Sequence, residues 1–290
     1  MSETLTVCVD PHVHSEASYD ATDPVELILE QAAEIGLDAV VVTDHDVLHE
    51  SLRAAELASE YGLVGIPGVE VSTADGHLLA VGVEEMPPRR RPLDETVAWV
   101  RDRGGVAIVP HPFQRSRHGV RKRPLADCDV DAIEVYNSWL FTGYKNRRAR
   151  RFADKHGYPG VAGSDAHHVP SIGRAFTEIE VEGVSRAELT ADVLLDAIRE
   201  GDTAVQGRRQ PIPVSAHHYG VGAARKSGYY AKAGAIRSAY YAKTGAITSA
   251  YYAKKGGLRS AYYAKTGALR GATGMFRTMQ SLYRRTPLSR

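Results

Sequence analysis

The chain has 290 residues, of which 43% are hydrophobic, and a formal net charge of +1. This length allows one large domain plus a smaller segment, and this composition can build a buried core. The two cysteines, Cys8 and Cys128, lie far apart, which argues against a disulfide-stabilised secreted protein and favours a cytoplasmic one. The N-terminus lacks the apolar stretch of a signal peptide, and no apolar run has the length of a transmembrane segment.

The near-neutral net charge hides an uneven distribution of charge along the chain. Residues 208–290 contain 16 Lys and Arg and no acidic residue, whereas residues 1–207 contain 20 basic and 35 acidic residues. We therefore predict a globular domain at residues 1–210 and a basic tail at residues 211–290. The acidic, lysine-poor domain suggests the hypothesis of a protein kept soluble at high salt.

Apolar runs and turn residues predict alternating strands and helices. Residues 5–9 form the first expected strand, and Asp23 and Pro24 then predict the capped start of a helix that ends at Gly36. The alternation continues along the chain and favours a parallel α/β architecture. The later expected strands are 39–43, 63–72, 77–83, 106–109, 132–136, 161–162 and 177–181, and the later expected helices are 48–61, 93–103, 144–156 and 189–200.

Histidines and carboxylates recur where these apolar runs stop. His12 and His14 are two residues apart, so in a strand both would point to the same side. In β/α barrels functional residues gather where strands end, and only His77 breaks this rule, which suggests that its strand runs against the others. Imidazole with carboxylate suits zinc, manganese or iron. The candidate metal ligands are His12, His14, Asp20, His45, Glu70, His77, His111, Asp165 and His167.

Polar residues beside the candidate ligands suggest further roles. A basic loop follows His111, and its Arg115 and Arg117 are expected to bind substrate phosphate, although a solvated charge run is the alternative. Asn137 follows an expected strand and is a third candidate for substrate contact. Asp44 and Asp46 flank a candidate ligand and are expected to orient ligand imidazoles, with turn formation as their alternative role. His118 and His168 are open either to proton donation or to a surface position.

Five motifs follow one another within about residues 5–210. They are His-x-His, Thr-Asp-His-Asp, Gly-Val-Glu-Val-Ser, Pro-His-Pro and Gly-Ser-Asp-Ala-His. In this order they resemble the PHP family, named for polymerase and histidinol phosphatase domains. The resemblance implies an α/β fold, a distorted, TIM-like barrel of seven β/α units with metals at the carboxyl ends of the strands.

The resemblance also implies how the ligands divide among two or three divalent ions. Glu70 would bridge the first and second ions. The expected catalytic residues, which act by holding the metal-activated hydroxide, are Glu70, His12, His14, Asp165 and His167. The expected sets are His12, His14, Glu70 and Asp165 for the first ion, Glu70, His77 and His111 for the second, and Asp20, His45 and His167 for the third.

The expected function is metal-dependent hydrolysis of phosphoesters. A nucleotide phosphatase or a 5′→3′ exonuclease acting on DNA or RNA is the leading expectation, so the partner would be a small phosphorylated substrate or a nucleic-acid 5′ end. Many such relatives carry a long insertion that this chain lacks, because only 33 residues separate His77 from His111. The alternatives are a histidinol-phosphate phosphatase and, in another class, a non-catalytic nucleic-acid-binding PHP module.

The basic tail contains an 11-residue repeat. Tyr-Tyr-Ala-Lys recurs at residues 229–232, 240–243, 251–254 and 262–265. Eleven residues make three helical turns, so each position would keep its face in a helix, but a glycine in each repeat weakens that helix. We expect a tail that is disordered or becomes helical on a nucleic acid or an anionic membrane.

Overall fold

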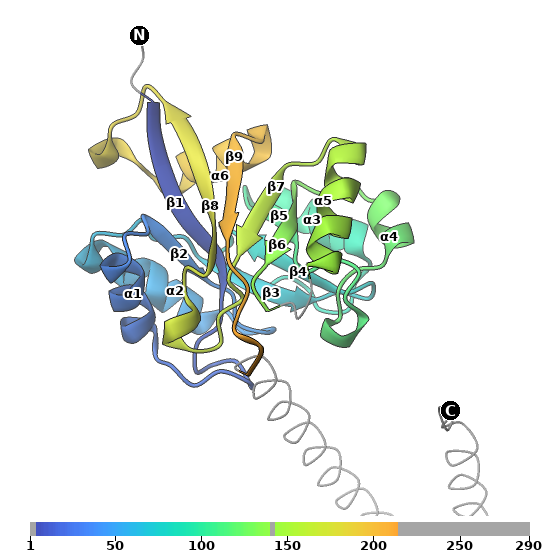
Figure 1. Cartoon of the computed structure of the whole chain (residues 1–290), viewed down its shortest axis with the longest axis horizontal. Coiled ribbons are helices and arrows are strands. Elements are labelled where there is room, and N and C mark those ends of the chain that lie inside the picture. The colour runs from blue at the N-terminus through green and yellow to red at the C-terminus, as the bar shows by residue number, and fades with distance from the viewer. Residues whose placement is uncertain (1–3, 140–142, 214–290) are drawn as a thin grey trace, which may run out of the picture. The chain divides into compact units, whose positions relative to one another are not determined.

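A computed structural model of the chain describes residues 4–139 and 143–213. The chain divides into two units, Met1–His218 and Tyr219–Arg290, and all described residues belong to the first. The described part is a mixed α/β fold with two sheets (Figure 1). The predicted repeat lies outside the described residues.

The first sheet contains the N-terminal strand and two strands from late in the chain. The strand order is β2-β1-β8-β9, with β1 parallel to β2 and antiparallel to β8. Helices α1 and α2 lie beside β2 (Figure 1). The bounds are Thr4–Val13 for β1, Ala39–Val42 for β2, Ala175–Glu182 for β8, Thr203–Gly207 for β9, Val25–Glu34 for α1 and His49–Leu57 for α2.

The second sheet runs in chain order, β3-β4-β5-β6-β7. Strands β5, β6 and β7 are parallel, whereas β4 is antiparallel to both of its neighbours. The strand that starts at His77 therefore runs against the others, as its position predicted, and its first residue lies opposite Ser72 at the end of β3. The bounds are Gly68–Ser72, His77–Val81, Val106–Val109, Ala132–Asn137 and Gly160–Gly163 for β3 to β7.

Among the described residues, isolated backbone bridges connect the regions of the two sheets, and side chains from both sheets pack into one buried cluster that includes Val9 and Ile108. These bridges join Val13 to Ala166, Ala39 to Val64 and His45 to Glu70. The α/β class is confirmed, but a closed barrel of seven units is not, because no continuous ladder joins the sheets. The predicted parallel architecture holds for β1 with β2 and for β5 to β7, whereas β8 and β9 pair antiparallel with their neighbours, which the sequence did not predict.

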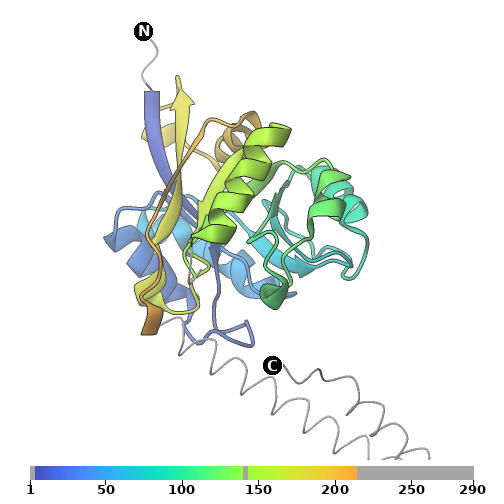
Figure 2. The same cartoon turned by 45° about the vertical axis from the view of Figure 1, so that its right-hand side comes forward.

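Helices α1 and α2 pack on the first sheet and α3 to α5 on the second, whereas α6 packs into the buried cluster that both sheets share. Helix α5 packs against β6 and lies in the foreground of Figure 2, and its bounds are those predicted from the sequence. Helix α6 packs against β8 and β5. The bounds are Leu93–Arg101 for α3, Lys122–Ala126 for α4, Tyr144–His156 for α5 and Ala191–Glu200 for α6, and single 3₁₀ turns occupy Ala58–Tyr61, Arg115–Arg117, Val169–Ser171 and Arg186–Glu188.

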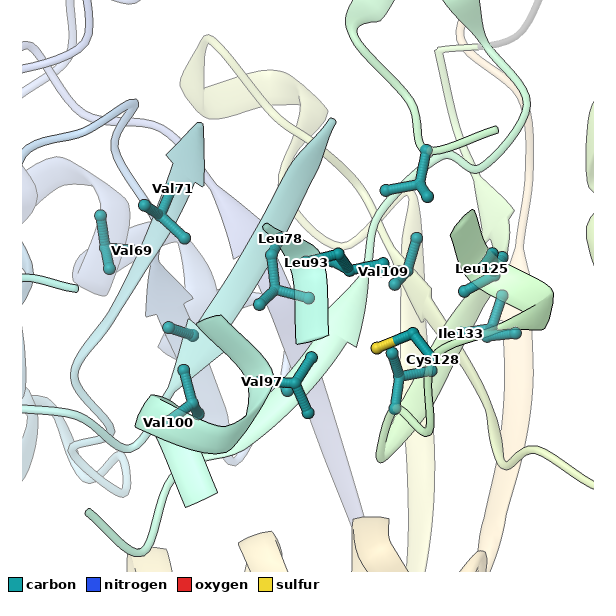
Figure 3. Close-up of a cluster of buried hydrophobic side chains, with 14 of the residues drawn as sticks. Val69, Val71, Leu78, Leu93, Val97, Val100, Val109, Leu125, Cys128 and Ile133 are labelled. Carbon is teal, nitrogen blue, oxygen red and sulfur yellow. The ribbon is translucent and has the colours of Figure 1, made fainter. Parts of the chain in front are cut away.

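The core beneath α3 shows why this segment is helical. Leu93, Val97 and Val100 recur at helical spacing and are all buried. Figure 3 shows them facing the strand residues Leu78 and Val109, with which they form one buried cluster. Each buried side chain of this size contributes about 1.5–3 kcal/mol to the free energy of folding. This packing holds the second sheet in place behind the candidate ligands.

One predicted helix cap is wrong. Asp23 does not cap α1, because its Oδ2 accepts a 2.7 Å hydrogen bond from the backbone nitrogen of Val169. The carboxylate instead ties the loop before α1 to the loop that follows β7 and Asp165. None of the helices in residues 4–139 and 143–213 combines the length and apolar character needed to span a membrane.

Candidate metal centre

His12 and His14 converge because β1 continues as an extended strand through the first of them. Their Nε2 atoms are 3.3 Å apart, and both rings are buried. The two Nε2 atoms lie 3.5 Å and 3.4 Å from Oε2 of Glu70, which β3 brings in from the other sheet. The same-side geometry expected from the i, i+2 spacing therefore places both imidazoles against one carboxylate.

Glu70 is the hub of the centre. Its Oε1 lies 2.7 Å from Nδ1 of His77 and 3.0 Å from Nε2 of His111, and its Oε2 lies 2.9 Å from Nδ1 of His45. Five imidazoles thus surround a single buried carboxylate. Burial raises the pKa of Glu70, but the His77 and His45 imidazoles outweigh burial and hold that pKa well below its usual range.

Asp165 and Asp20 close the other side of the centre. Oδ1 of Asp165 lies 3.3 Å from Nε2 of His14 and 3.6 Å from Nδ1 of His167. Oδ2 of Asp20 lies 3.3 Å from Nε2 of His167 and 3.5 Å from Nε2 of His45. Because both carboxylates touch His167, the loops after β1 and β7 meet at this residue.

All nine predicted ligands lie in this one cluster, but their grouping is more connected than the resemblance implied. His12 is shared between groups, and His45 lies with Glu70 and His77 as well as with His14 and His167. Ligand atoms within 4.8 Å of one another form four overlapping groups: His12, His14 and Asp165; His12, Glu70 and His111; His45, Glu70 and His77; His14, His45 and His167.

The unsatisfied oxygens of the cluster fit divalent metal ions. Oε2 of Glu70, Oδ1 of Asp165 and Oδ1 of Asp20 are buried and have no hydrogen-bond partner among the described residues. A buried carboxylate oxygen without a hydrogen bond is costly, and a cation removes that cost. Imidazole and carboxylate together are donors that zinc, manganese and iron accept. The residues present therefore fit the group that the sequence predicted.

The backbone is strained at two of the ligands. His111 has φ of 31° and Asp165 has φ of 55°, in the region that side chains other than glycine rarely adopt. Both residues follow strands of the second sheet, β5 and β7, which hold the preceding residues in place. Such strain is concentrated at functional sites, where the fold holds a side chain in one required direction.

Glu134 supports the centre and was not predicted from the sequence. Its Oε1 lies 3.0 Å from Nδ1 of His12, and its Oε2 accepts hydrogen bonds from the backbone nitrogen of His111 at 2.6 Å and from Nδ2 of Asn137 at 2.9 Å. One carboxylate thus orients two candidate ligands. The available signal was a lone acid inside the apolar run 132–136, which becomes the buried centre of β6.

The predicted roles of the two aspartates around His45 differ in the structure. Asp44 reaches an imidazole through Ser18, whose Oγ donates to Asp44 at 2.8 Å and lies 3.0 Å from Nδ1 of His14. Asp46 orients no imidazole of the described residues, so that expectation is wrong. Its Oδ1 accepts a hydrogen bond from the backbone nitrogen of Ser72 at 2.8 Å, which fixes the end of β3 instead.

The three predicted substrate-binding residues fall in two places. Arg117 donates hydrogen bonds to Oδ2 of Asp165 and to Oδ1 of Asn137, the latter at 3.2 Å. Asn137 donates to Oδ2 of Asp165 at 2.9 Å, so both residues hold this candidate ligand. Burial raises the pKa of Asp165, but Arg117 and His12 outweigh burial and keep that pKa well below its usual range. Arg115 lines a neighbouring cavity instead.

Two adjoining cavities open beside the cluster. The first has a volume of about 370 Å³, and its lining includes His45 and His77 from the cluster together with Tyr19 and Arg89. The second has a volume of about 500 Å³ and is lined by Arg115 and Arg121, among others. Both cavities share Ser72, His77 and His118, so together they lead from the candidate ligands to an arginine-lined surface.

Comparisons with known proteins agree with the motifs. Residues 143–203 match a family model described as PHP-associated. The fold resembles that of a two-domain protein from Bacteroides vulgatus that contains a predicted PHP-like metal-dependent phosphoesterase, with a TM-score of 0.59 and 20% identity over 71% of this chain and 66% of that one. The predicted resemblance to PHP proteins is therefore confirmed.

The curated relatives match smaller parts of this chain than that structure does. One of them has no described activity, and another is an enzyme matched over a short segment. An uncharacterized protein of Methanocaldococcus jannaschii is 27% identical over 48% of this chain and 87% of its own length. A phosphoribosyl 1,2-cyclic phosphate 1,2-diphosphodiesterase of Eggerthella lenta is 40% identical over 85 residues, which are 27% of this chain and 32% of the enzyme. The second match spans only about a third of that enzyme.

Proposed function

We propose that this PHP-like chain is a metal-dependent phosphoesterase whose centre is built on Glu70. The observation that carries the proposal is that both oxygens of this buried carboxylate face imidazoles, while Oε2 lacks a hydrogen bond from any described residue. The nine clustered side chains would hold two or three divalent ions such as manganese, zinc or iron. Bound ions would supply a hydroxide at neutral pH and neutralise charge on the phosphate.

The protein groups around the centre have distinct tasks in this proposal. Glu134 holds His12 through Nδ1 and so leaves Nε2 directed toward Glu70. Arg117 and Asn137 hold Asp165, the carboxylate that faces His14. In this proposal none of these groups acts as a nucleophile, because each one holds a candidate ligand in place.

We further propose nucleotides or the 5′ ends of nucleic acids as substrates. Support comes from the cations beyond the ligands, since Arg89 lines one cavity and Arg115 and Arg121 line the next. Arginine binds phosphate oxygens bidentately, so these side chains suit phosphates that follow the reacting one. The relative from Eggerthella lenta, a phosphodiesterase, acts on a phosphoester and supports the same reaction class.

The test is hydrolysis by the full chain loaded with Mn²⁺ or Zn²⁺. The panel should contain 4-nitrophenyl phosphate, a nucleoside 5′-monophosphate, a 5′-phosphorylated oligonucleotide and histidinol phosphate. We expect turnover that is lost in Glu70→Gln and retained in Glu84→Gln, because Glu84 is exposed. Turnover of histidinol phosphate alone would replace the nucleotide proposal, and no turnover by the metal-loaded wild type would refute an enzymatic role.

A further inference from the structure

Four aromatic rings form a row along the cavity of about 370 Å³, namely those of Tyr19, His45, His77 and His118. Tyr19 stacks on His45 with centroids 5.0 Å apart and planes 20° apart. His45 and His77 follow at 5.3 Å, and His118 stacks on His77 at 5.3 Å. The two inner rings touch Glu70, so the outer rings stand at the edge of the candidate metal centre.

Tyr19 is the exposed end of this row. It retains 72% of its accessible surface, and one of its faces lies on His45. Its neighbours in sequence are both anchored in the centre, since Ser18 donates a hydrogen bond to Asp44 and Asp20 lies 3.3 Å from His167. The ring is therefore presented at a set position, and this lowers the entropy lost when a ligand stacks on it.

The cavity has the size and chemistry for a planar group attached to a phosphate. Its volume lies within the usual range for small-molecule sites. Arg89, with a side chain 60% exposed, supplies positive charge on the same lining and lies 3.8 Å from Asp46. An aromatic face accepts any nucleobase, because every base has a π-face.

We propose that Tyr19 is a specificity-determining residue that stacks on a planar ring of the substrate. The site then prefers phosphoesters that carry a nucleobase close to the reacting phosphate over those that carry no ring. This inference rests on the proposed phosphoesterase function and names the part of the substrate that the first cavity selects.

The test compares adenosine 5′-monophosphate with ribose 5-phosphate, which share the same phosphoester and differ in the base. In the Mn²⁺-loaded full chain we expect Tyr19→Ala to lower kcat/KM for the nucleotide about tenfold, within the range that stacking on one base supports. Hydrolysis of ribose 5-phosphate should change less than about twofold, because that substrate offers no ring to stack. Tyr19→Phe should behave as wild type, since it keeps the ring.

Tyr144→Ala is the matched control. This tyrosine is also exposed, at 57%, and lines neither cavity. Equal losses on both substrates in Tyr19→Ala would overturn the stacking role. A loss of kcat in Tyr19→Phe as large as that in Tyr19→Ala would assign the hydroxyl, and not the ring, as the important group. Metal content is measured in every variant, because Tyr19 touches His45.

Equilibrium binding separates this inference from the proposed function. Calorimetric titration of the Mn²⁺-loaded chain should show that the nucleotide binds more tightly than ribose 5-phosphate, and that Tyr19→Ala removes this preference. If the preference is present without any turnover, the phosphoesterase proposal fails and the stacking role stands. If both compounds bind equally to the wild type, the stacking role fails whatever the turnover.

Discussion

Oε1 of Glu134 lies 3.0 Å from Nδ1 of His12, on the opposite side of the ring from Glu70. A carboxylate accepts hydrogen bonds, so Nδ1 carries a proton, and Nε2 is the ring nitrogen directed into the cluster. The same carboxylate also holds the backbone of His111. Glu134 thereby sets the direction of one candidate ligand and the loop position of another without belonging to the ligand set.

Glu134→Gln is therefore expected to weaken metal binding about 10- to 100-fold, the usual effect of losing such an outer partner. The measurement is a titration of the metal-free protein with Zn²⁺ or Mn²⁺, with circular dichroism to check the fold. Glu180→Gln is the control, because Glu180 is an exposed glutamate of another strand, β8. Unchanged affinity in Glu134→Gln would contradict the role given to this carboxylate.

Metal content is expected to be two or three ions per chain after reconstitution with manganese or zinc. Nine clustered ligand side chains exceed what one ion can use. Elemental analysis of the dialysed protein gives the number. Glu70→Gln should reduce it by at least one ion, whereas His49→Ala should not, since the His49 side chain is 71% exposed and 3.8 Å from Glu50. A single ion in the wild type would rule out the multinuclear centre.

Removal of bound metal is expected to lower the melting temperature of the domain. A ligand that binds only the folded state stabilises it by about 2.7 kcal/mol when present at 100 times its Kd. The three buried oxygens without hydrogen bonds would in addition become uncompensated. Thermal unfolding is followed with chelator, and then after excess Zn²⁺ is restored. Identical melting temperatures in both conditions would show that the centre binds no metal.

Gly163→Ala is expected to disturb the centre without removing any ligand. A Cβ at this position would lie 2.7 Å from Cβ of His12 and 2.7 Å from Oε1 of Glu134, too close for either to stay in place. Overpacking of this kind costs about 1–3 kcal/mol of folding free energy. Gly143→Ala is the control, because a Cβ there meets nothing within 4 Å. Denaturant unfolding and metal titration of both variants check the prediction.

Arg115→Ala and Arg117→Ala are expected to have different effects, although the sequence placed both in one basic loop. Arg117→Ala should weaken metal binding about tenfold, because it removes the hydrogen bonds to Asp165 and Asn137. Arg115→Ala should leave metal content intact and raise KM for a phosphorylated substrate about tenfold, since this residue lines the adjoining cavity. Metal titration and steady-state kinetics distinguish the two variants. Equal changes in metal affinity and in KM would show that both arginines have the same role.

Deletion of residues 222–290 is expected to leave metal binding and hydrolysis of a small phosphoester unchanged. All nine candidate ligands precede residue 168, and the deleted segment carries much of the basic charge. Affinity for a polyanion should fall, with a weaker dependence on salt because fewer counterions are released. Full-length and truncated chains are compared on single-stranded nucleic acid and on anionic vesicles. Loss of hydrolysis after deletion would place the domain boundary elsewhere.

The sequence by itself determined the class of fold, the family resemblance and the set of side chains that meet in the cluster. It could do so because strands leave a regular apolar pattern, and because residues at strand ends share one edge of a sheet. The same reasoning identified the reversed strand at His77, since this ligand opens its strand whereas the others stand within or follow theirs. Helix α5 was predicted to the residue, and in the structure it ends just before Gly157, which adopts the left-handed conformation.

Only the tertiary structure decided which partners these residues take. Glu134 meets His12 across 122 positions of sequence, and Arg117 meets Asp165 across 48, so no local pattern records either pair. The antiparallel pairing of β8 with β1 and the separation into two sheets likewise depend on long-range packing. Sequence periodicity reports the face on which a side chain lies, whereas the identity of the group opposite is set by how distant strands come together.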